Sequence, residues 1–296
     1  MEFKGTYTAL VTPFKNDEVD YEGLKKNILF QIEEGVDGIV PLGTTGETPT
    51  LSEEEQERII KLALETAKGK VKVIVGTGSN STKHTIEKTQ RAKDFGADAV
   101  LIVTPYYNKP TQEGIFQHFK AVSEAVDIPI VVYNIQGRSG VNIETATLQR
   151  IAPLRGIIGV KEASGNLNQM MDVLQTIQTA AHPQFTVLSG DDAMTVPLIA
   201  MGGRGVVSVV SNLVPGKIVA MVNAALQGDL ALARKMHYEL LPLFQTAFIE
   251  TNPVPIKEAM QLCGMAAGNC RLPLCEMKSE NHEKLRAVLQ QMSVLP

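Results

Sequence analysis

The chain has 296 residues, 44% hydrophobic and 20% charged, with a formal net charge of −4. This composition is typical of a globular enzyme and excludes disordered, collagen-like and disulfide-rich classes. The net charge is negative and the sequence has no cluster of basic residues. We therefore expect neither nucleic acid nor a membrane as a partner. The length allows either two domains or one α/β barrel of roughly 250 residues.

The N-terminal segment predicts a cytoplasmic location. It lacks the basic start, apolar run and small-residue cleavage site of a secretion signal. No stretch reaches the roughly 18 apolar residues of a membrane span. Cys263, Cys270 and Cys275 form no Cys-x-x-Cys pair, so we expect reduced thiols rather than metal ligands.

Eight short apolar runs alternate with longer amphipathic segments. In chain order they cover residues 7–11, 38–42, 71–75, 99–103, 130–133, 157–161, 186–188 and 205–209. Continuous apolar character is typical of strands that are covered on both faces. Eight strands, each followed by a helix, predict a (β/α)8 TIM barrel over residues 1–227, with the active site in it.

Local signals predict where several helices begin and end. Residues 52–55 (SEEE) predict a capping box, and Asp20 and Ser81 are expected N-caps. Three glycines are expected to end helices: Gly35, Gly96 and Gly202. Beyond residue 227, helical spacing over residues 229–247, 252–263 and 279–292 predicts a C-terminal three-helix segment, residues 228–296.

Catalytic residues of such barrels lie at the C-terminal ends of the strands. The second run leads into Gly43-Thr44-Thr45-Gly46-Glu47, whose hydroxyl and backbone N–H groups can hold a carboxylate. An ordinary Gly/Thr turn is the alternative. Tyr107 and Tyr133 follow at the ends of the fourth and fifth runs, and tyrosines at strand ends are most often packing residues with a solvated hydroxyl.

Lys161 ends the sixth apolar run, an unusual place for a charged residue. A buried ammonium is unfavourable unless it is paired or neutral. Since burial favours the neutral amine, Lys161 is a candidate nucleophile for Schiff-base chemistry. The alternative is a lysine that extends its ammonium to the barrel mouth.

Other cofactor and metal motifs are incomplete. The sequence has no P-loop, no full dinucleotide fingerprint and no His-Glu-x-x-His. Asp191 and Asp192 could bind a divalent ion, but a polar loop held by backbone N–H groups is favoured. We therefore predict no cofactor and no metal.

Five segments together carry a family resemblance. They are residues 8–14 (TALVTPF), residues 43–47 (GTTGE), Tyr133-Asn134 with Arg138 and Gly140, residues 159–164 (GVKEAS) and residues 188–192 (LSGDD). From about residue 3 to the C-terminal helices, the chain resembles the dihydrodipicolinate synthase and N-acetylneuraminate lyase superfamily. The second Thr of GTTGE and Arg138 resemble the dihydrodipicolinate synthases rather than the sialic acid lyases.

The resemblance implies a lyase of lysine and diaminopimelate biosynthesis that works as a class I aldolase. Lys161 would form a Schiff base with pyruvate, and the resulting enamine would attack L-aspartate 4-semialdehyde. Thr44 and Thr45, with the loop N–H groups flanked by Gly43 and Gly46, would hold the pyruvate carboxylate.

The resemblance also implies a proton relay and a homo-oligomer. Tyr133, hydrogen-bonded to Thr44, would relay protons, and Tyr107 would complete the relay from a neighbouring subunit. Val207 would offer its carbonyl to the Lys161 amine. Arg138 would bind the semialdehyde carboxylate, a role suited to a planar guanidinium. The expected assembly is a tetramer built as a dimer of dimers.

Two departures from the family pattern matter. The usual proline between Tyr133 and Arg138 is replaced by Gln136-Gly137, which predicts a less preorganised Arg138. Feedback by L-lysine is expected to be weak or absent, because His84 stands where inhibited members have Glu and Gln56 stands where they have His. The remaining matching positions are Thr48, Pro49, Glu53, Asn80 and Tyr106.

Two alternatives to this activity remain. Another pyruvate-dependent aldolase of the superfamily would act on a sugar acid or a hydroxy-oxo acid. A non-catalytic binding barrel would keep Thr44, Thr45 and Arg138 but would have no need of Lys161.

Overall fold

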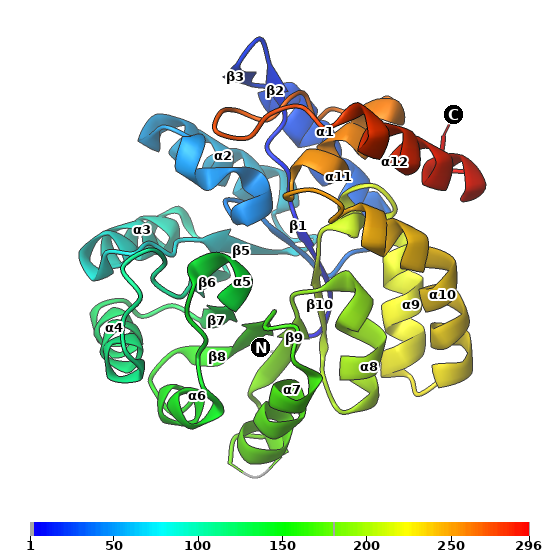
Figure 1. Ribbon diagram of the computed structural model, residues 1–296. Helices are drawn as coiled ribbons and strands as arrows, with labels where there is room; N and C mark the ends of the chain where they lie inside the picture. Colours follow the sequence, from blue (N-terminus) through cyan, green and yellow to red (C-terminus); the bar gives the residue numbers. More distant parts are fainter. Residues whose placement is uncertain (1–2, 180, 296) are drawn as a thin grey trace.

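The computed structural model describes residues 3–179 and 181–295. Eight parallel strands form a closed barrel in the order β1-β10-β9-β8-β7-β6-β5-β4, and helices surround it (Figure 1). This confirms the predicted (β/α)8 barrel. Strands β2 and β3 form a separate antiparallel ribbon.

Each observed barrel strand begins and ends within two residues of its predicted run. The strands are β1 (Gly5–Ala9), β2 (Phe14–Lys15), β3 (Glu18–Val19), β4 (Gly38–Val40), β5 (Lys72–Gly76), β6 (Ala99–Val103), β7 (Ile130–Asn134), β8 (Ile157–Glu162), β9 (Thr186–Ser189) and β10 (Gly205–Ser208).

Helices follow the strands and continue beyond the barrel. They are α1 (Tyr21–Glu33), α2 (Glu53–Ala67), α3 (Thr82–Phe95), α4 (Gln112–Ala125), α5 (Gln136–Ser139), α6 (Thr145–Ile151), α7 (Leu167–Val173), α8 (Thr195–Ala200), α9 (Pro215–Leu226), α10 (Leu230–Thr246), α11 (Val254–Leu262) and α12 (Ser279–Gln291). Short helical turns are η1 (Thr44–Gly46), η2 (Thr48–Thr50), η3 (Leu174–Thr179), η4 (Asp192–Met194) and η5 (Val210–Asn212).

The predicted helix ends are confirmed. Ser52 and Glu55 form a reciprocal capping box at the start of α2, which satisfies two otherwise unpaired N–H groups. Asp20 and Ser81 cap α1 and α3 through N–H groups of the first turn. Gly96 ends α3 at a φ of 93°, a left-handed conformation that glycine adopts without a steric penalty.

The barrel closes where β1 meets β10, with Gly5 opposite Gly205. A Cβ atom at Gly205 would lie 2.0 Å from the Gly5 carbonyl oxygen, and its φ is 146°. Glycine is therefore required at position 205 for the first and last strands to pair.

The C-terminal helices pack on the barrel and on each other. Helix α10 lies against α8 and α9, and α12 lies against α10 and α11 (Figure 1). One buried cluster joins Ile218 and Met221 of α9 with Leu243 of α10, Ile256 of α11 and Leu285 of α12. Among the described residues, no helix is both long and apolar enough to cross a membrane.

Candidate active site

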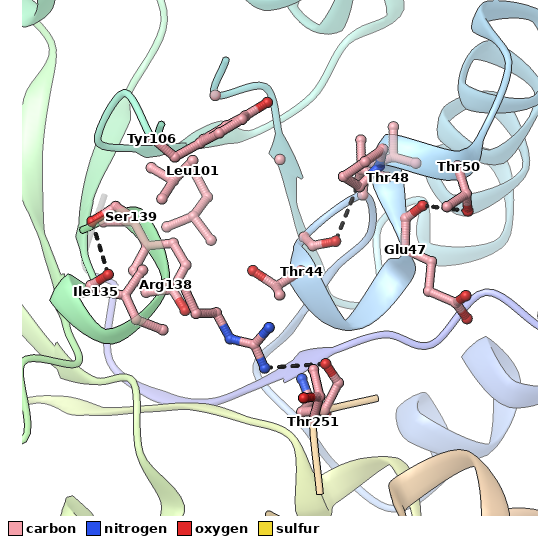
Figure 2. A pocket seen from close by; sticks show the side chains of 18 of the residues that line it. Thr44, Glu47, Thr48, Thr50, Leu101, Tyr106, Ile135, Arg138, Ser139 and Thr251 are labelled. Atoms are coloured by element: carbon pink, nitrogen blue, oxygen red, sulfur yellow. Dashed lines mark hydrogen bonds between the residues drawn. The ribbon is translucent and has the colours of Figure 1, made fainter. Parts of the chain in front are cut away.

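A cavity of about 360 Å³ opens at the C-terminal ends of the strands. Gly43 and Thr44 line it from the turn after β4, Tyr133 from the end of β7, and Arg138 from α5. Figure 2 shows Thr44 and Arg138 on facing sides of this cavity. The structure therefore brings together four residues that the sequence analysis selected from separate segments.

Lys161 is not among the residues that line this cavity, but its side chain lies against Tyr133, which does line it. The two residues are register partners on β8 and β7, and the Lys161 Nζ atom is 4.1 Å from the centre of the Tyr133 ring. Both side chains are only 5% exposed. Within residues 3–179 and 181–295, no carboxylate forms an ion pair with Lys161.

Gly190, which follows β9, makes room for the lysine side chain. A Cβ atom at this position would lie 2.6 Å from Ala163 Cβ and 3.1 Å from Lys161 Cε. The glycine of the LSGDD segment is thus explained by close packing next to Lys161. From the sequence alone, this role could not be distinguished from that of an ordinary loop glycine.

The Gly-Thr-Thr-Gly-Glu turn (residues 43–47, the GTTGE turn) forms the helical turn η1. Its N–H groups at Gly46 and Glu47 donate to the carbonyls of Gly43 and Thr44, both at 3.1 Å. The N–H groups of Thr44 and Thr45 come before these bonds in the turn, and the first N–H groups of a helical turn have no partner within it. Thr44 lines the cavity, whereas Thr45 is buried and its Oγ1 accepts a 2.9 Å hydrogen bond from Asn252 Nδ2.

The guanidinium of Arg138 is anchored although the usual proline is missing. Gln136 and Gly137 belong to the helical turn α5, which ends at Gly140. Arg138 Nη2 donates to the carbonyl oxygen of Asn252 at 3.1 Å. Asn252 therefore contacts both Thr45 and Arg138. The sequence analysis missed this role because it placed residue 252 only as the start of a predicted helix.

Two contacts implied by the family resemblance are not formed in the described part of the single chain. Among the described residues, no hydrogen bond joins the Tyr133 and Thr44 side chains, and none joins the Lys161 amine to the Val207 carbonyl. Val207 itself is buried in β10. Tyr107 is 89% exposed, outside the cavity, and has a strained φ of 73°.

Asp191 and Asp192 stabilise the loop after β9. Asp192 accepts hydrogen bonds from the Ser208 hydroxyl and from the N–H groups of Val209 and Val210. Burial raises the pKa of Asp192 to about 6, and these hydrogen bonds oppose the shift. Asp191 accepts from the Ala193 N–H at 2.9 Å. In the described part of the chain, no group of three or more His, Cys, Asp and Glu side chains could hold a metal ion.

These features define a class: a (β/α)8-barrel enzyme with a buried lysine at the end of the sixth barrel strand, next to a cavity that carries an arginine. A sequence model of the dihydrodipicolinate synthetase family matches residues 2–292. The chain belongs to this family.

Individual members of the family are similar to this chain over nearly its whole length. The 4-hydroxy-tetrahydrodipicolinate synthase of Protochlamydia amoebophila is 57% identical over 293 residues, which cover 99% of this chain and 97% of the relative. The crystal structure of dihydrodipicolinate synthase from Thermotoga maritima is 44% identical with a TM-score of 0.97, covering 100% of both chains. That of the Acinetobacter baumannii enzyme, complexed with pyruvate, is 38% identical with a TM-score of 0.95, covering 99% of both chains.

Proposed function

We propose that the protein is a 4-hydroxy-tetrahydrodipicolinate synthase, which condenses pyruvate with L-aspartate 4-semialdehyde through a Schiff base on Lys161. The observation that carries the proposal is the burial of Lys161 against the Tyr133 ring, without an acidic partner in the described part of the chain. Relatives with this activity in their name and a pyruvate-bound neighbour support it. The product enters lysine and diaminopimelate biosynthesis in the cytoplasm.

Lys161 supplies the nucleophile. Its neutral amine attacks the C2 carbonyl of pyruvate, and loss of water leaves a protonated imine. The imine accepts the electron pair of a methyl C–H bond as the proton leaves, which gives an enamine. Tyr133, whose ring centre lies 4.1 Å from the Lys161 Nζ atom, carries protons to and from these groups.

Carbon–carbon bond formation and ring closure follow. The enamine carbon attacks the aldehyde carbon of the semialdehyde, and the imine re-forms. The amine of the second substrate then attacks C2 and expels the Lys161 amine, so the enzyme is regenerated. No step needs an oxidant, a cofactor or a metal.

Two anchors orient the substrates. The N–H groups of Thr44 and Thr45 and the Thr44 hydroxyl bind the pyruvate carboxylate, since the first N–H groups of a helical turn attract an anion. Arg138, fixed by the Asn252 carbonyl, binds the semialdehyde carboxylate as a bidentate partner. Val207 supports the Lys161 amine through its backbone carbonyl once substrate is bound.

The active unit is a homo-oligomer, a tetramer built as a dimer of dimers, in which residues 1–227 form the catalytic barrel and residues 228–296 the C-terminal segment. Tyr107 supports this assignment because its aromatic ring is 89% exposed on a strained backbone, far more than packing within one subunit would leave.

Borohydride trapping tests the proposal. Pyruvate with borohydride should attach a reduced adduct to Lys161 and to no other lysine, as located by peptide mass spectrometry. Lys257, the other buried lysine, is an internal control because its ammonium is already ion-paired. Lys161→Met should abolish labelling, and an active enzyme without an adduct on Lys161 would refute the mechanism.

The second substrate is identified by turnover with pyruvate as a fixed donor. L-aspartate 4-semialdehyde should be the best acceptor, and activity should survive EDTA. Faster turnover of a sugar-derived aldehyde would indicate another aldolase of the family. Loss of activity in EDTA, restored by a divalent ion, would indicate a metal-dependent reaction.

A further inference from the structure

Lys257, on α11, is a fully buried lysine that the proposed reaction does not use. It is 1% exposed, and its Nζ atom lies 2.7 Å from Glu47 Oε1. The same ammonium donates to the carbonyls of Thr12 at 3.1 Å and Asn269 at 3.0 Å. All three of its N–H donors therefore have partners.

Glu47 ends the GTTGE turn in a left-handed conformation, with a φ of 54°. Its second carboxylate oxygen, Oε2, accepts from the backbone N–H of Arg271 at 2.9 Å. Both oxygens are thus held by the C-terminal segment. Figure 2 shows the Glu47 carboxylate directed away from Arg138, so it does not compete for that guanidinium.

Thr12 provides a second connection from Lys257 to the same turn. Its carbonyl accepts the Lys257 bond, and its hydroxyl donates to the Gly46 carbonyl at 2.7 Å. Asn252, just before α11, donates to Thr45. Thr45 and Glu47 are therefore held directly by Asn252 and Lys257, and Gly46 is held indirectly, through Thr12.

Fold stability alone does not explain this ion pair. Burying two charges carries a desolvation penalty, and apolar side chains of similar volume often stabilise a fold equally well. The hydrogen bonds of a buried ammonium are directional, however, and fix the backbone to which they connect. The same turn carries the N–H groups of Thr44 and Thr45, to which the proposed function assigns the pyruvate carboxylate.

We propose that Lys257 is a positioning residue that, through Glu47 and Thr12, fixes the GTTGE turn in the geometry that binds the pyruvate carboxylate. The proposal rests on the proposed function for the identity of the bound carboxylate. The rigidity of the turn is a separate property that can be measured without any substrate.

Two variants weaken the connection without leaving a single buried charge. Thr12→Val removes the bond to the Gly46 carbonyl and keeps the shape of the side chain. The double variant Lys257→Met/Glu47→Gln removes both charges together, which avoids the larger destabilisation caused by one unpaired buried charge. Leu285→Ala is the matched control, because it opens a cavity in α12 and touches no residue of the turn.

Amide hydrogen exchange of peptides that cover residues 43–47 gives the first measurement. Exchange should be faster by about tenfold in both test variants and unchanged in Leu285→Ala, relative to a peptide in β6. Equal protection in the wild type and a folded test variant would overturn the proposal. Equal acceleration in the control would also overturn it, because general loosening would then be the cause.

The pyruvate concentration for half-maximal borohydride labelling gives the second measurement. It should rise about tenfold in the double variant and a few-fold in Thr12→Val, the amounts expected for loss of one charged and one neutral hydrogen bond. The KM of the second substrate should change less than twofold. Wild-type protein that takes no label would refute the Schiff-base function, while the exchange data would still decide the role of Lys257.

Discussion

Tyr133 and Lys161 face each other across neighbouring strands, with the lysine Nζ atom 4.1 Å from the centre of the tyrosine ring. The contact is to the ring face, where the negative π-electron density attracts a cation. The phenol hydroxyl does not take part in this contact. The ring can therefore hold the lysine in place while the hydroxyl moves protons.

Tyr133→Phe separates these two roles, because phenylalanine keeps the ring and loses the hydroxyl. We expect kcat to fall by about 10²–10⁴, the range for removal of a general acid–base. Slow labelling of Lys161 by pyruvate and borohydride should persist. Tyr238→Phe, on the exposed surface of α10, is the matched control. Wild-type kcat in Tyr133→Phe would exclude the relay.

Arg138→Ala should lower kcat/KM for the semialdehyde and leave kcat/KM for pyruvate nearly unchanged. Loss of a charge-assisted hydrogen bond, worth roughly 1.5–3 kcal/mol, corresponds to about a ten- to hundredfold decrease in kcat/KM for that substrate. Arg138→Lys should recover little, since an ammonium cannot form the bidentate pair. Steady-state kinetics with each substrate varied in turn measures both effects. An equal decrease for pyruvate would argue against the assigned carboxylate.

Tyr107→Phe should lower kcat more than it raises the KM for pyruvate, because a proton relay acts mainly in the transition state. Sedimentation of the wild-type protein at assay concentrations should show at least a dimer and, by our proposal, a tetramer. A stable monomer with full activity would contradict the contribution of Tyr107 from a neighbouring subunit.

L-lysine should inhibit weakly or not at all. Glu53 is the nearby carboxylate that could replace the glutamate expected at the position of His84, and in this structure it pairs with Arg91 at 3.4 Å instead. Gln56 Nε2 is bonded to the Leu51 carbonyl at 2.9 Å. Initial rates near pH 8 with saturating substrates measure the effect of added L-lysine. Half-inhibition below a millimolar concentration would show that the effector site works without that carboxylate.

His118 should make the fold less stable as the pH falls from about 6.5 to about 4. Burial lowers the pKa of this imidazole to about 4, so in that window the unfolded chain binds a proton that the folded protein excludes. The free energy of unfolding should fall by about 1.4 kcal/mol per pH unit within this window, and by about 3 kcal/mol in total. Above pH 7 the imidazole is neutral in both states and the effect vanishes.

Urea unfolding of wild type and His118→Gln at several pH values isolates this contribution. Because Asp192 has a pKa raised to about 6 and changes stability in the opposite direction, only the difference between the two proteins is informative. The free energy of unfolding of His118→Gln should increase relative to that of the wild type as the pH falls. A difference that stays constant between pH 7 and 4 would show that His118 is not the group responsible.

Local sequence signals predicted the barrel well because its elements depend on near neighbours. Apolar runs placed the strands, and Ser52 and Glu55 act within one helical turn. Lys161 was found for the same reason, since a charged residue at the end of an apolar run is conspicuous without any knowledge of its partners.

Partners distant in the sequence could not be predicted in this way. Lys257 meets Thr12 across 245 positions and Glu47 across 210 positions, and no local pattern records those contacts. Asn252 reaches Thr45 across 207 positions. The hydrogen bond between Tyr133 and Thr44, expected from the family resemblance alone, is not formed in the described single chain.

The same distances determine when a newly made chain becomes competent. The barrel strands end at residue 208, yet the groups that hold the GTTGE turn, from Asn252 to Arg271, leave the ribosome later. A growing chain that has released all eight barrel strands therefore still lacks the groups that hold this turn. We expect the proposed pyruvate site to form only when synthesis of the chain is almost complete.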